Sequence, residues 1–444
     1  MSTSLSTPSC PPTTRPPAET LAPLLPVVGA ATRVPLATGG SRRYANLDNA
    51  ASAPALAAVA DRVAQVLPHY ASVHRGAGYL SRVCTELFEA ARADVGRFTG
   101  ARHDDVVVFT RSTTDALDLL SRSVPAGGRV LVADVEHHAN LLPWQRGSRT
   151  TVVTGGDDVA ATAAALEAEL AGGGYALLAV TGASNVTGEV LPLGRLARAA
   201  HRAGARIAVD GAQLLPHRRV DLAREEVDWI AFSGHKLYAP FGAGALVGRR
   251  DWLDAAEPYL AGGGATLDVD SEAVRWAAAP ERHEAGSPNV VGAVALAQAA
   301  RTLSALAPGA LQAHEAALRE RLVAGLQALD GVHVVRPDAD DTVGVVTFTL
   351  PGHPSSKVAA YLSAEHGIGV RDGRFCAHRF ANALGLTAGG LRASTGVGTG
   401  SADVDRLVGA IARYLADGPA LEYGVLEDGW GPLTDARPAP ADFL

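Results

Sequence analysis

The sequence has little lysine, little cysteine and no long hydrophobic run, and each scarcity excludes a class of protein. No apolar stretch approaches the roughly 18 residues that a membrane helix needs, and the N-terminus lacks the basic start and apolar core of a signal peptide. The net charge of −7 gives no reason to expect nucleic acid or an anionic membrane as a partner. We therefore expect a cytoplasmic protein.

The three cysteines, Cys10, Cys84 and Cys376, are too few and too scattered for a disulfide framework or a zinc site, so no metal site is predicted. Only two lysines, Lys236 and Lys357, stand in a chain that otherwise uses arginine for positive charge. An amine can lose its proton and attack a carbonyl, whereas a guanidinium in practice cannot. The scarcity of lysine indicates that a lysine is present where the chemistry requires an amine and arginine cannot replace it.

The 444 residues are enough for two domains. Residues 1–40 are rich in Pro, Ser, Thr and Ala without apolar periodicity, which predicts a disordered tail. Residues 41–305 are predicted to form a large domain, whose first part contributes to the small one, and a helix over 289–306 links the two. Residues 306–444 are predicted to form an α+β domain with a polar loop at 372–379 and a loosely packed Pro-rich end.

Short apolar runs alternate with helical stretches through the large domain. This alternation predicts an α/β fold with a mainly parallel seven-stranded sheet covered on both faces. In such sheets ligands bind at the carboxyl ends of the strands. The expected strands are 106–109, 129–133, 151–153, 176–181, 206–209, 229–232 and 243–247.

Polar residues follow several of these runs. Thr113 and Thr114 begin a predicted helix, where hydroxyls and free N–H groups suit a phosphate, although taken alone they are better explained by an ordinary helix cap. His137 follows the second run and can stack on an aromatic cofactor, although a lone histidine is more often structural. Asn185 stands in a later loop, where asparagine is usually a turn former.

Two further strand ends carry charge. Asp210 ends a buried strand, where a carboxylate needs a cation such as a protonated pyridine nitrogen or an arginine. Lys236 follows an apolar strand, where desolvation lowers an amine pKa and favours imine chemistry. Together these features supply a phosphate cradle, a stacking ring, a pyridine partner and an imine-forming amine. That set predicts pyridoxal 5'-phosphate (PLP) as the cofactor.

Four motifs carry a resemblance to a known family: residues 136–140 (EHHAN), 210–213 (DGAQ), 233–238 (SGHKLY) and 284–289 (EAGSPN). They resemble the class V aminotransferase superfamily and, within it, the Suf-type (group II) cysteine desulfurases and selenocysteine lyases. The resemblance extends over about residues 44–415. It implies PLP-dependent fold type I.

The resemblance also implies roles for individual residues. Lys236 would bond covalently to the cofactor and move the substrate α-proton, while His137 stacks on the ring and takes part in proton transfer. A second subunit would complete the phosphate site, which implies a homodimer. The remaining implied contacts are Asp210 with the ring nitrogen, Gln213 and Asn185 with the ring hydroxyl, Thr113, Thr114, Ser233, His235 and the second subunit's Ser287 with the phosphate, and Arg392, Arg371 and Asn185 with the substrate.

Cys376 is the most informative position. In the desulfurases that the sequence resembles, a cysteine here attacks the substrate sulfur, becomes a persulfide and passes sulfur to an acceptor protein, while L-cysteine becomes L-alanine. The chemistry needs a thiolate on a mobile loop near cations, which Arg371, Arg374, His378 and Arg379 supply in sequence. The alternative is a structural buried cysteine, the usual fate of a lone one.

Some positions depart from the desulfurase pattern. Gly78 stands where those enzymes carry a histidine, Arg374 and Phe375 replace two histidines, and residues 395–400 are slim and glycine-rich. These changes surround the substrate and not the cofactor. They leave open a PLP-dependent C–S lyase, selenocysteine lyase, epimerase or aminotransferase acting on another amino acid in specialised biosynthesis, and also a PLP-binding partner or regulator without turnover.

Overall fold

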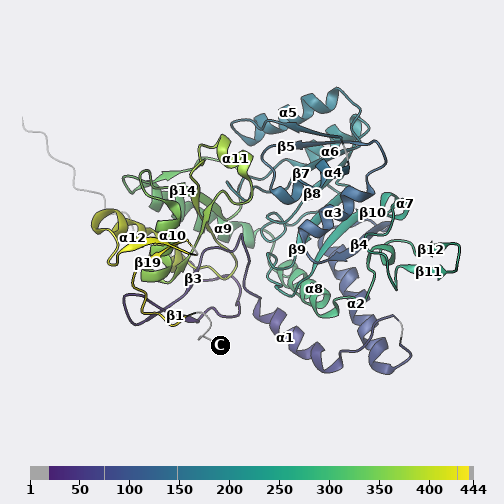
Figure 1. Ribbon diagram of the computed structural model, residues 1–444, viewed down its shortest axis with the longest axis horizontal. Coiled ribbons are helices and arrows are strands. Elements are labelled where there is room, and N and C mark those ends of the chain that lie inside the picture. The colour runs from purple at the N-terminus through teal and green to yellow at the C-terminus, as the bar shows by residue number, and fades with distance from the viewer. Residues whose placement is uncertain (1–19, 75, 148, 428, 440–444) are drawn as a thin grey trace, which may run out of the picture.

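Seven apolar segments form the central sheet. The computed structural model describes residues 20–439 except 75, 148 and 428. The strands are β4 Asp105–Thr110, β5 Arg129–Ala133, β6 Arg149–Val153, β7 Leu177–Thr181, β8 Arg206–Asp210, β9 Trp229–Ser233 and β10 Gly244–Arg249. Their order is β4-β10-β9-β8-β7-β5-β6, with β6, β5, β7, β8 and β9 parallel and β10 antiparallel to both neighbours (Figure 1). The predicted mainly parallel seven-stranded sheet is confirmed.

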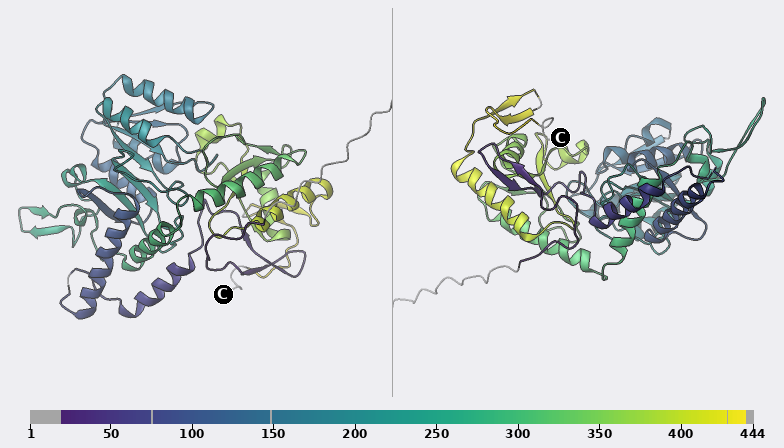
Figure 2. Two further views of the ribbon diagram at one scale, coloured as in Figure 1. Left: turned by 180° about the vertical axis from the view of Figure 1, so that it is seen from behind. Right: turned by 90° about the horizontal axis from the view of Figure 1, so that it is seen from below.

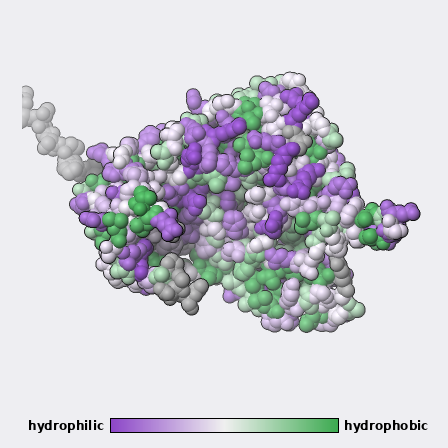
Figure 3. All heavy atoms as spheres, viewed as in Figure 1, coloured by the Kyte–Doolittle hydropathy of each residue, from purple (hydrophilic) through white to green (hydrophobic). Residues whose placement is uncertain are grey.

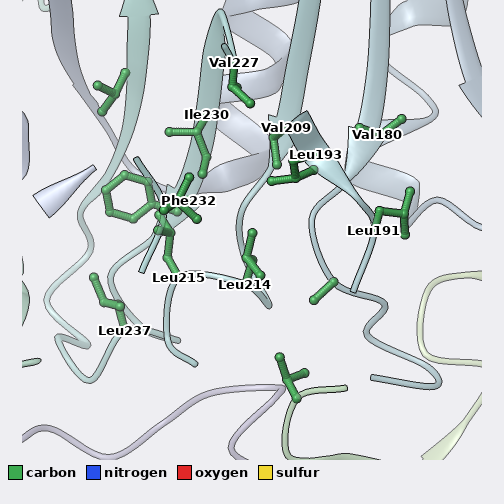
Figure 4. Packing of buried hydrophobic residues seen from close by; sticks show 14 of the residues in the cluster. Val180, Leu191, Leu193, Val209, Leu214, Leu215, Val227, Ile230, Phe232 and Leu237 are labelled. Atoms are coloured by element: carbon green, nitrogen blue, oxygen red, sulfur yellow. The ribbon is translucent and has the colours of Figure 1, made fainter. Parts of the chain in front are cut away.

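The sheet is buried on both faces, which explains why its strands read as continuous apolar runs. In β5, Val130 and Val132 belong to one core cluster, whereas Leu131 and Ala133 belong to the other. Figure 4 shows one of these clusters, in which side chains from β7, β8 and β9 pack together. One face is covered by α3 Thr113–Ser123, α4 Trp144–Gly147 and α7 Asp251–Ala255, and the other by α5 Val159–Ala171, α6 Leu193–Arg202 and α8 Val290–Ser304.

A smaller lobe is built mainly from the C-terminal part of the chain (Figure 2). Its antiparallel sheet has the order β13-β14-β17-β16, formed by β13 His333–Val334, β14 Val345–Thr349, β16 Arg371–Gly373 and β17 Gly390–Ser394. The helices α9 Ala310–Gln327, α10 Ser355–His366 and α12 Ser401–Asp417 pack in the same core. Near the N-terminus, β3 Ala45–Asn46 pairs in parallel with β15 Ile368–Gly369, so this early segment packs with the smaller lobe.

The N-terminal segment differs from the prediction. Residues 20–40 are ordered, although a disordered tail was predicted over 1–40, and residues 1–19 lie outside the described residues. The backbone N–H groups of Leu24 and Leu25 donate to the carbonyl of Val397 at 2.7 and 3.0 Å. We call residues 20–28 the N-terminal strap. Its hydrogen bonds go to segments that are distant in the sequence, including Ala55 and Ser401, and such bonds leave no periodic pattern in the sequence. The next residues pair β1 Arg33–Pro35 with β2 Ser41–Arg43.

The C-terminal end is also more ordered than predicted, because β18 Tyr423–Leu426 and β19 Gly429–Pro432 form an antiparallel hairpin against α10. A second hairpin projects from the large lobe (Figure 2). Among the described helices, none combines the length and the apolarity that a membrane crossing requires. The remaining elements are α1 Ala57–Val66, η1 Leu67–His69, α2 Tyr79–Phe98, η2 His138–Asn140, the projecting β11 Thr266–Val269 and β12 Val274–Trp276, η3 Glu281–His283 and α11 His378–Ala383.

Candidate active site

The loops that follow four neighbouring parallel strands meet at one edge of the large sheet. His137 follows β5, Asn185 follows β7, Asp210 ends β8 and Lys236 follows β9. They line a cavity of about 330 Å³ on the side of the smaller lobe, where Figure 3 shows a hydrophilic hollow between the lobes. Of the predicted site residues, the cavity is lined by Thr113, Thr114, His137, Asn185, Asp210, Gln213, Ser233, His235, Lys236, Arg371, Cys376 and Arg392.

Lys236 has the properties of a reactive amine. Burial, opposed by Asp210 and aided by Arg392, lowers the pKa of its ammonium group to about 8. A neutral, nucleophilic amine is therefore accessible close to neutral pH. The other lysine differs, because the Lys357 ammonium lies 5.6 Å from the centre of the Trp430 ring and outside the cavity.

The buried acceptor atoms of Asp210 and Gln213 indicate whether the cavity fits a pyridoxal ring. Asp210 is buried, burial raises the pKa of its carboxyl group, and its only side-chain hydrogen bond within the described chain is the one from Ala212 N at 2.9 Å. Gln213 donates from Nε2 to the carbonyl of Ala50 at 2.6 Å, whereas its buried Oε1 has no partner among the described residues. A ring nitrogen that carries a proton and a ring hydroxyl that donates one would satisfy these two acceptors, so the residues fit PLP.

The predicted phosphate site lies at the start of α3. The Ser233 hydroxyl lies 2.7 Å from both the backbone N and the hydroxyl of Thr113, so β9 and the helix N-terminus share one polar cluster. Gly244 permits this close approach, because a Cβ there would lie 2.9 Å from the Cα of Ser112. Burial, and then the charge of Lys236, lower the pKa of His235, so this ring is available as a neutral hydrogen-bond donor.

His137 is a neutral imidazole. Burial, followed by the positive charges of Lys236, His138 and Arg392, lowers its pKa to about 3. Its Nδ1 accepts a hydrogen bond from the backbone N of Ala139 at 3.0 Å, which places the ring proton on Nε2. The ring therefore presents a hydrogen-bond donor, Nε2–H, and its tautomer is set by its own loop.

Arg392 is held by two partners on different segments. Nη1 donates to the carbonyl of Asn185 at 3.0 Å, and Nη2 donates to Asp48 Oδ1 at 3.1 Å. The guanidinium is 3% exposed, and its Nε has no hydrogen-bond partner among the described residues. Arg371 faces Arg392 across the β16–β17 pair and is exposed. The cavity thus contains two guanidinium groups, of which Asp48 neutralises one.

Cys376 lies in a shorter loop than predicted. The polar loop expected at 372–379 is reduced to residues 374–377, because β16 ends at Gly373 and α11 begins at His378. The carbonyl of Cys376 accepts from His138 N at 2.8 Å, and the carbonyl of Phe375 accepts from Asn185 Nδ2 at 2.7 Å. The predicted mobile loop is therefore anchored from two strand ends, and its thiol is exposed.

The backbone of this loop is strained. Phe375 and Cys376 have φ angles of 54° and 53°, in the left-handed region that non-glycine residues rarely adopt. Strain of this kind persists where surrounding contacts fix it, and the two anchoring hydrogen bonds do so here. The buried Phe375 ring also lies 5.2 Å from the guanidinium carbon of Arg392.

Ser287 is the predicted site residue that the chain does not bring into this cavity. It lines a separate one, together with Tyr70, His74 and Glu284. The segment that carries it is fixed by Arg92, which donates to both carboxylate oxygens of Glu284 at 2.8 Å.

The sequence reasoning assigned no role to Asp48 or Glu136 and noted Phe375 only as a departure from the desulfurase pattern. Asp48 is bound to Arg392, and Phe375 packs against that same guanidinium. Glu136 is buried beside Asp210, where burial raises its pKa to about 8, and it accepts hydrogen bonds from Asn140 Nδ2 and Thr181 N. Glu136 lies within a motif that was recognised, whereas nothing in the local sequence distinguishes Asp48.

Comparisons with known proteins agree with this geometry. Residues 45–407 match the model of a family described as aminotransferase class V. The chain is 38% identical over 381 residues to a cysteine desulfurase of Dickeya dadantii, covering 83% of this chain and 91% of that protein. It is 34% identical over 386 residues to a probable cysteine desulfurase of Vibrio cholerae, covering 83% and 93%.

Solved structures give the same result at 32% identity. The structure of the cysteine desulfurase CsdA from Escherichia coli is similar with a TM-score of 0.76, covering 84% of this chain and 95% of that one. The apo structure of a cysteine desulfurase from Thermococcus onnurineus is similar with a TM-score of 0.77 and the same coverage. The similarity thus includes both lobes and the cavity between them.

Proposed function

Because the chain belongs to the class V aminotransferase family, we propose that it is a PLP-dependent cysteine desulfurase that converts L-cysteine to L-alanine and leaves sulfur on Cys376. One observation carries the proposal. Cys376, the only exposed thiol among the described residues, lines the same cavity as Lys236 and Arg392. A nucleophilic thiol, a reactive amine and a carboxylate-binding cation are the groups that desulfuration of an amino acid requires.

PLP and the residues that would bind it have different roles in the proposed reaction. When bound, PLP supplies an electron sink that stabilises negative charge at the substrate α-carbon. The carboxylate of Asp210 would keep the ring nitrogen protonated, and Oε1 of Gln213 would accept from the ring hydroxyl. The phosphate would be held by Thr113, Thr114, Ser233 and His235.

Lys236 would transfer the substrate α-proton, and His137 would donate a hydrogen bond. The amine of Lys236, with its pKa near 8, can take the α-proton at Nζ and return it. The neutral ring of His137 can donate a hydrogen bond from Nε2–H on the cavity side of β5. Arg392, with Arg371 and Asn185 beside it, would bind the substrate carboxylate and orient the side-chain sulfur.

Cys376 would perform the sulfur transfer. Its thiolate attacks the substrate sulfur, so an S–S bond forms while the Cβ–S bond breaks. The electron pair of the broken bond stays with carbon, which later takes up a proton as alanine forms. The sulfur remains on Cys376 as a persulfide and passes to an acceptor protein.

The same proposal includes the subgroup of the enzyme, its oligomeric state and its location in the cell. The motifs at residues 136–140, 210–213, 233–238 and 284–289 support placement among the Suf-type enzymes. Ser287 lines a cavity of its own, which supports a homodimer in which the partner subunit's Ser287 completes the phosphate site. A reactive thiol persists in a reducing compartment, which supports a cytoplasmic location.

A second candidate is a related C–S lyase, selenocysteine lyase, epimerase or aminotransferase that acts on another amino acid. Arg371 favours it, because its guanidinium has no ion pair in the described part of the chain and can bind a second anionic group of a larger substrate. In such an enzyme Cys376 would be dispensable.

The test is to incubate the PLP-loaded protein with L-cysteine and a reductant and to measure alanine and sulfide. We expect alanine from the parent and from Cys84→Ser, whose thiol is buried in α2, but none from Cys376→Ala. Lys236→Ala should lose both the activity and the visible absorption band of the covalently held cofactor. Formation of pyruvate at a rate that Cys376→Ala leaves unchanged would establish the second candidate instead.

A further inference from the structure

The thiol of Cys376 has little freedom to travel. Its loop has four residues between β16 and α11, and two successive carbonyls, those of Phe375 and Cys376, accept hydrogen bonds from Asn185 and His138. The strained φ angles at these residues fit the anchored geometry. A sulfur bound to Cys376 therefore leaves only if an acceptor thiol comes to it.

Two arginines and a histidine lie close to the exposed thiol in the sequence. Arg374 precedes it, and His378 and Arg379 follow it on α11. The His138 ring lies 4.5 Å from the ring of His378, and burial, then His378 and Arg374, lower the pKa of His138, which places these three groups together, with Arg379 next to His378 on α11. We call Arg374, His378 and Arg379, with His138, the basic rim.

The basic rim has no counter-charge of its own. In the described part of the chain, neither Arg374 nor Arg379 takes part in an ion pair or a side-chain hydrogen bond. The chain as a whole has a net charge of −7, and many of its other arginines are paired with carboxylates. Like charges gathered without a partner repel one another, and a docked group of opposite charge relieves that repulsion.

We propose that the basic rim docks an acidic segment of a sulfur-accepting protein and guides its cysteine to the sulfur on Cys376. This inference rests on the proposed desulfurase function. The acceptor thiolate attacks the outer sulfur of the persulfide, a new S–S bond forms, and the old one breaks. Cys376 leaves as a thiolate and the acceptor carries the persulfide, so the step needs no external oxidant or reductant.

Complementary charge acts chiefly on the rate of encounter. An acceptor whose cysteine is flanked by aspartate and glutamate is therefore expected to react faster than one flanked by lysine. The difference should shrink at high salt, because charges on an exposed surface are screened.

The experiment measures thiol attack at Cys376 without relying on desulfurase turnover. The PLP-loaded Cys10→Ser protein is treated with 2,2'-dithiodipyridine, which attaches a neutral thiopyridyl group to the exposed Cys376. Two synthetic peptides of equal length, one with an acid-flanked and one with a lysine-flanked cysteine, then displace it. Release of pyridine-2-thione gives each rate, and the ratio of the two rates is the readout. A general change in the reactivity of Cys376 cancels in this ratio.

We expect the acid-flanked peptide to react roughly tenfold faster at low salt, a preference that falls towards one in high salt. In Arg374→Glu/Arg379→Glu the ratio should approach one or invert. The matched control is Arg149→Glu/Arg198→Glu, whose exposed arginines lie at the start of β6 and on α6, and it should keep the parent ratio.

Equal rates for the two peptides with the parent protein would overturn the inference without any variant. So would a preference that the rim variant retains. The proposed desulfurase function is judged separately, by the appearance of a persulfide on Cys376 after L-cysteine is added. A protein that forms no persulfide but still prefers the acid-flanked peptide would lack the proposed function and keep the docking surface.

Discussion

The side-chain amide of Asn185 donates a hydrogen bond to the main-chain carbonyl of Phe375 at 2.7 Å, while the main-chain carbonyl of Asn185 accepts one from Arg392 at 3.0 Å. Asn185 therefore joins the loop of the candidate nucleophile to the candidate carboxylate clamp. The sequence predicted contacts of this residue with cofactor and substrate. In the structure, one N–H of its amide is committed to the loop.

Asn185→Ala should loosen the loop of Cys376. Loss of a buried hydrogen bond leaves the Phe375 carbonyl unsatisfied, and we expect the free energy of unfolding to fall by about 1–2 kcal/mol. Alanine formation from L-cysteine should fall about tenfold or more, whereas the absorption band of the bound cofactor should remain. Asn382→Ala, at an exposed position of α11, is the control. Loss of the cofactor band in Asn185→Ala would show that Asn185 acts on the cofactor instead.

Asp48 neutralises Arg392, and this pairing should set the affinity for the substrate carboxylate. Burial raises the pKa of Asp48 in opposition to Arg392, and its Oδ1 accepts from Nη2 at 3.1 Å. Asp48→Asn keeps an acceptor oxygen and removes the charge. We expect the KM for L-cysteine to fall about fivefold, because roughly 1 kcal/mol of competing attraction is lost. Asp372→Asn, which changes a nearby charge without a hydrogen bond to Arg392, should have less effect. A rise in KM would show that Asp48 chiefly orients the guanidinium.

His137 should make the fold sensitive to acid. Burial lowers its pKa from 6.5 to about 3, so between these values the unfolded chain binds a proton that the folded protein does not. Stability is therefore complete above about pH 6.5 and declines as the pH falls towards 3, by up to about 1.4 kcal/mol per pH unit from this residue. His137→Asn keeps an acceptor for Ala139 N and should flatten this slope in urea unfolding. An unchanged slope would contradict the neutral buried imidazole.

The N-terminal strap should depend on a glycine in the smaller lobe. A Cβ at Gly398 would lie 2.6 Å from Val27 Cγ2. We expect Gly398→Ala to lower the free energy of unfolding by about 1–3 kcal/mol, as overpacking does. Val27→Ala in the same chain should restore part of the loss, so the two changes are not additive. Gly78→Ala, where a Cβ meets nothing within 4 Å, is the control. If the two changes in the free energy of unfolding are additive, the destabilisation by Gly398→Ala does not come from contact with Val27.

The cofactor side of the site was predictable because its signals are local. Each of His137, Asn185, Asp210 and Lys236 follows an apolar run, and the carboxyl ends of parallel strands meet at one edge of a sheet. Alternation of strand and helix gave the seven-stranded sheet for the same reason. Each strand and each helix has its own hydrophobic pattern, which can be recognised without knowing the rest of the chain.

The sequence by itself thus determined the sheet, the lysine and the order of the groups along the strand ends. Tertiary structure alone decided which distant segments complete the site. Asp48 reaches Arg392 across 344 positions, and Asn185 reaches Phe375 across 190. The left-handed backbone at Phe375 and Cys376, the short anchored loop and the ordered strap likewise follow from such contacts. No local pattern encodes them, because their energy comes from partners that only folding brings near.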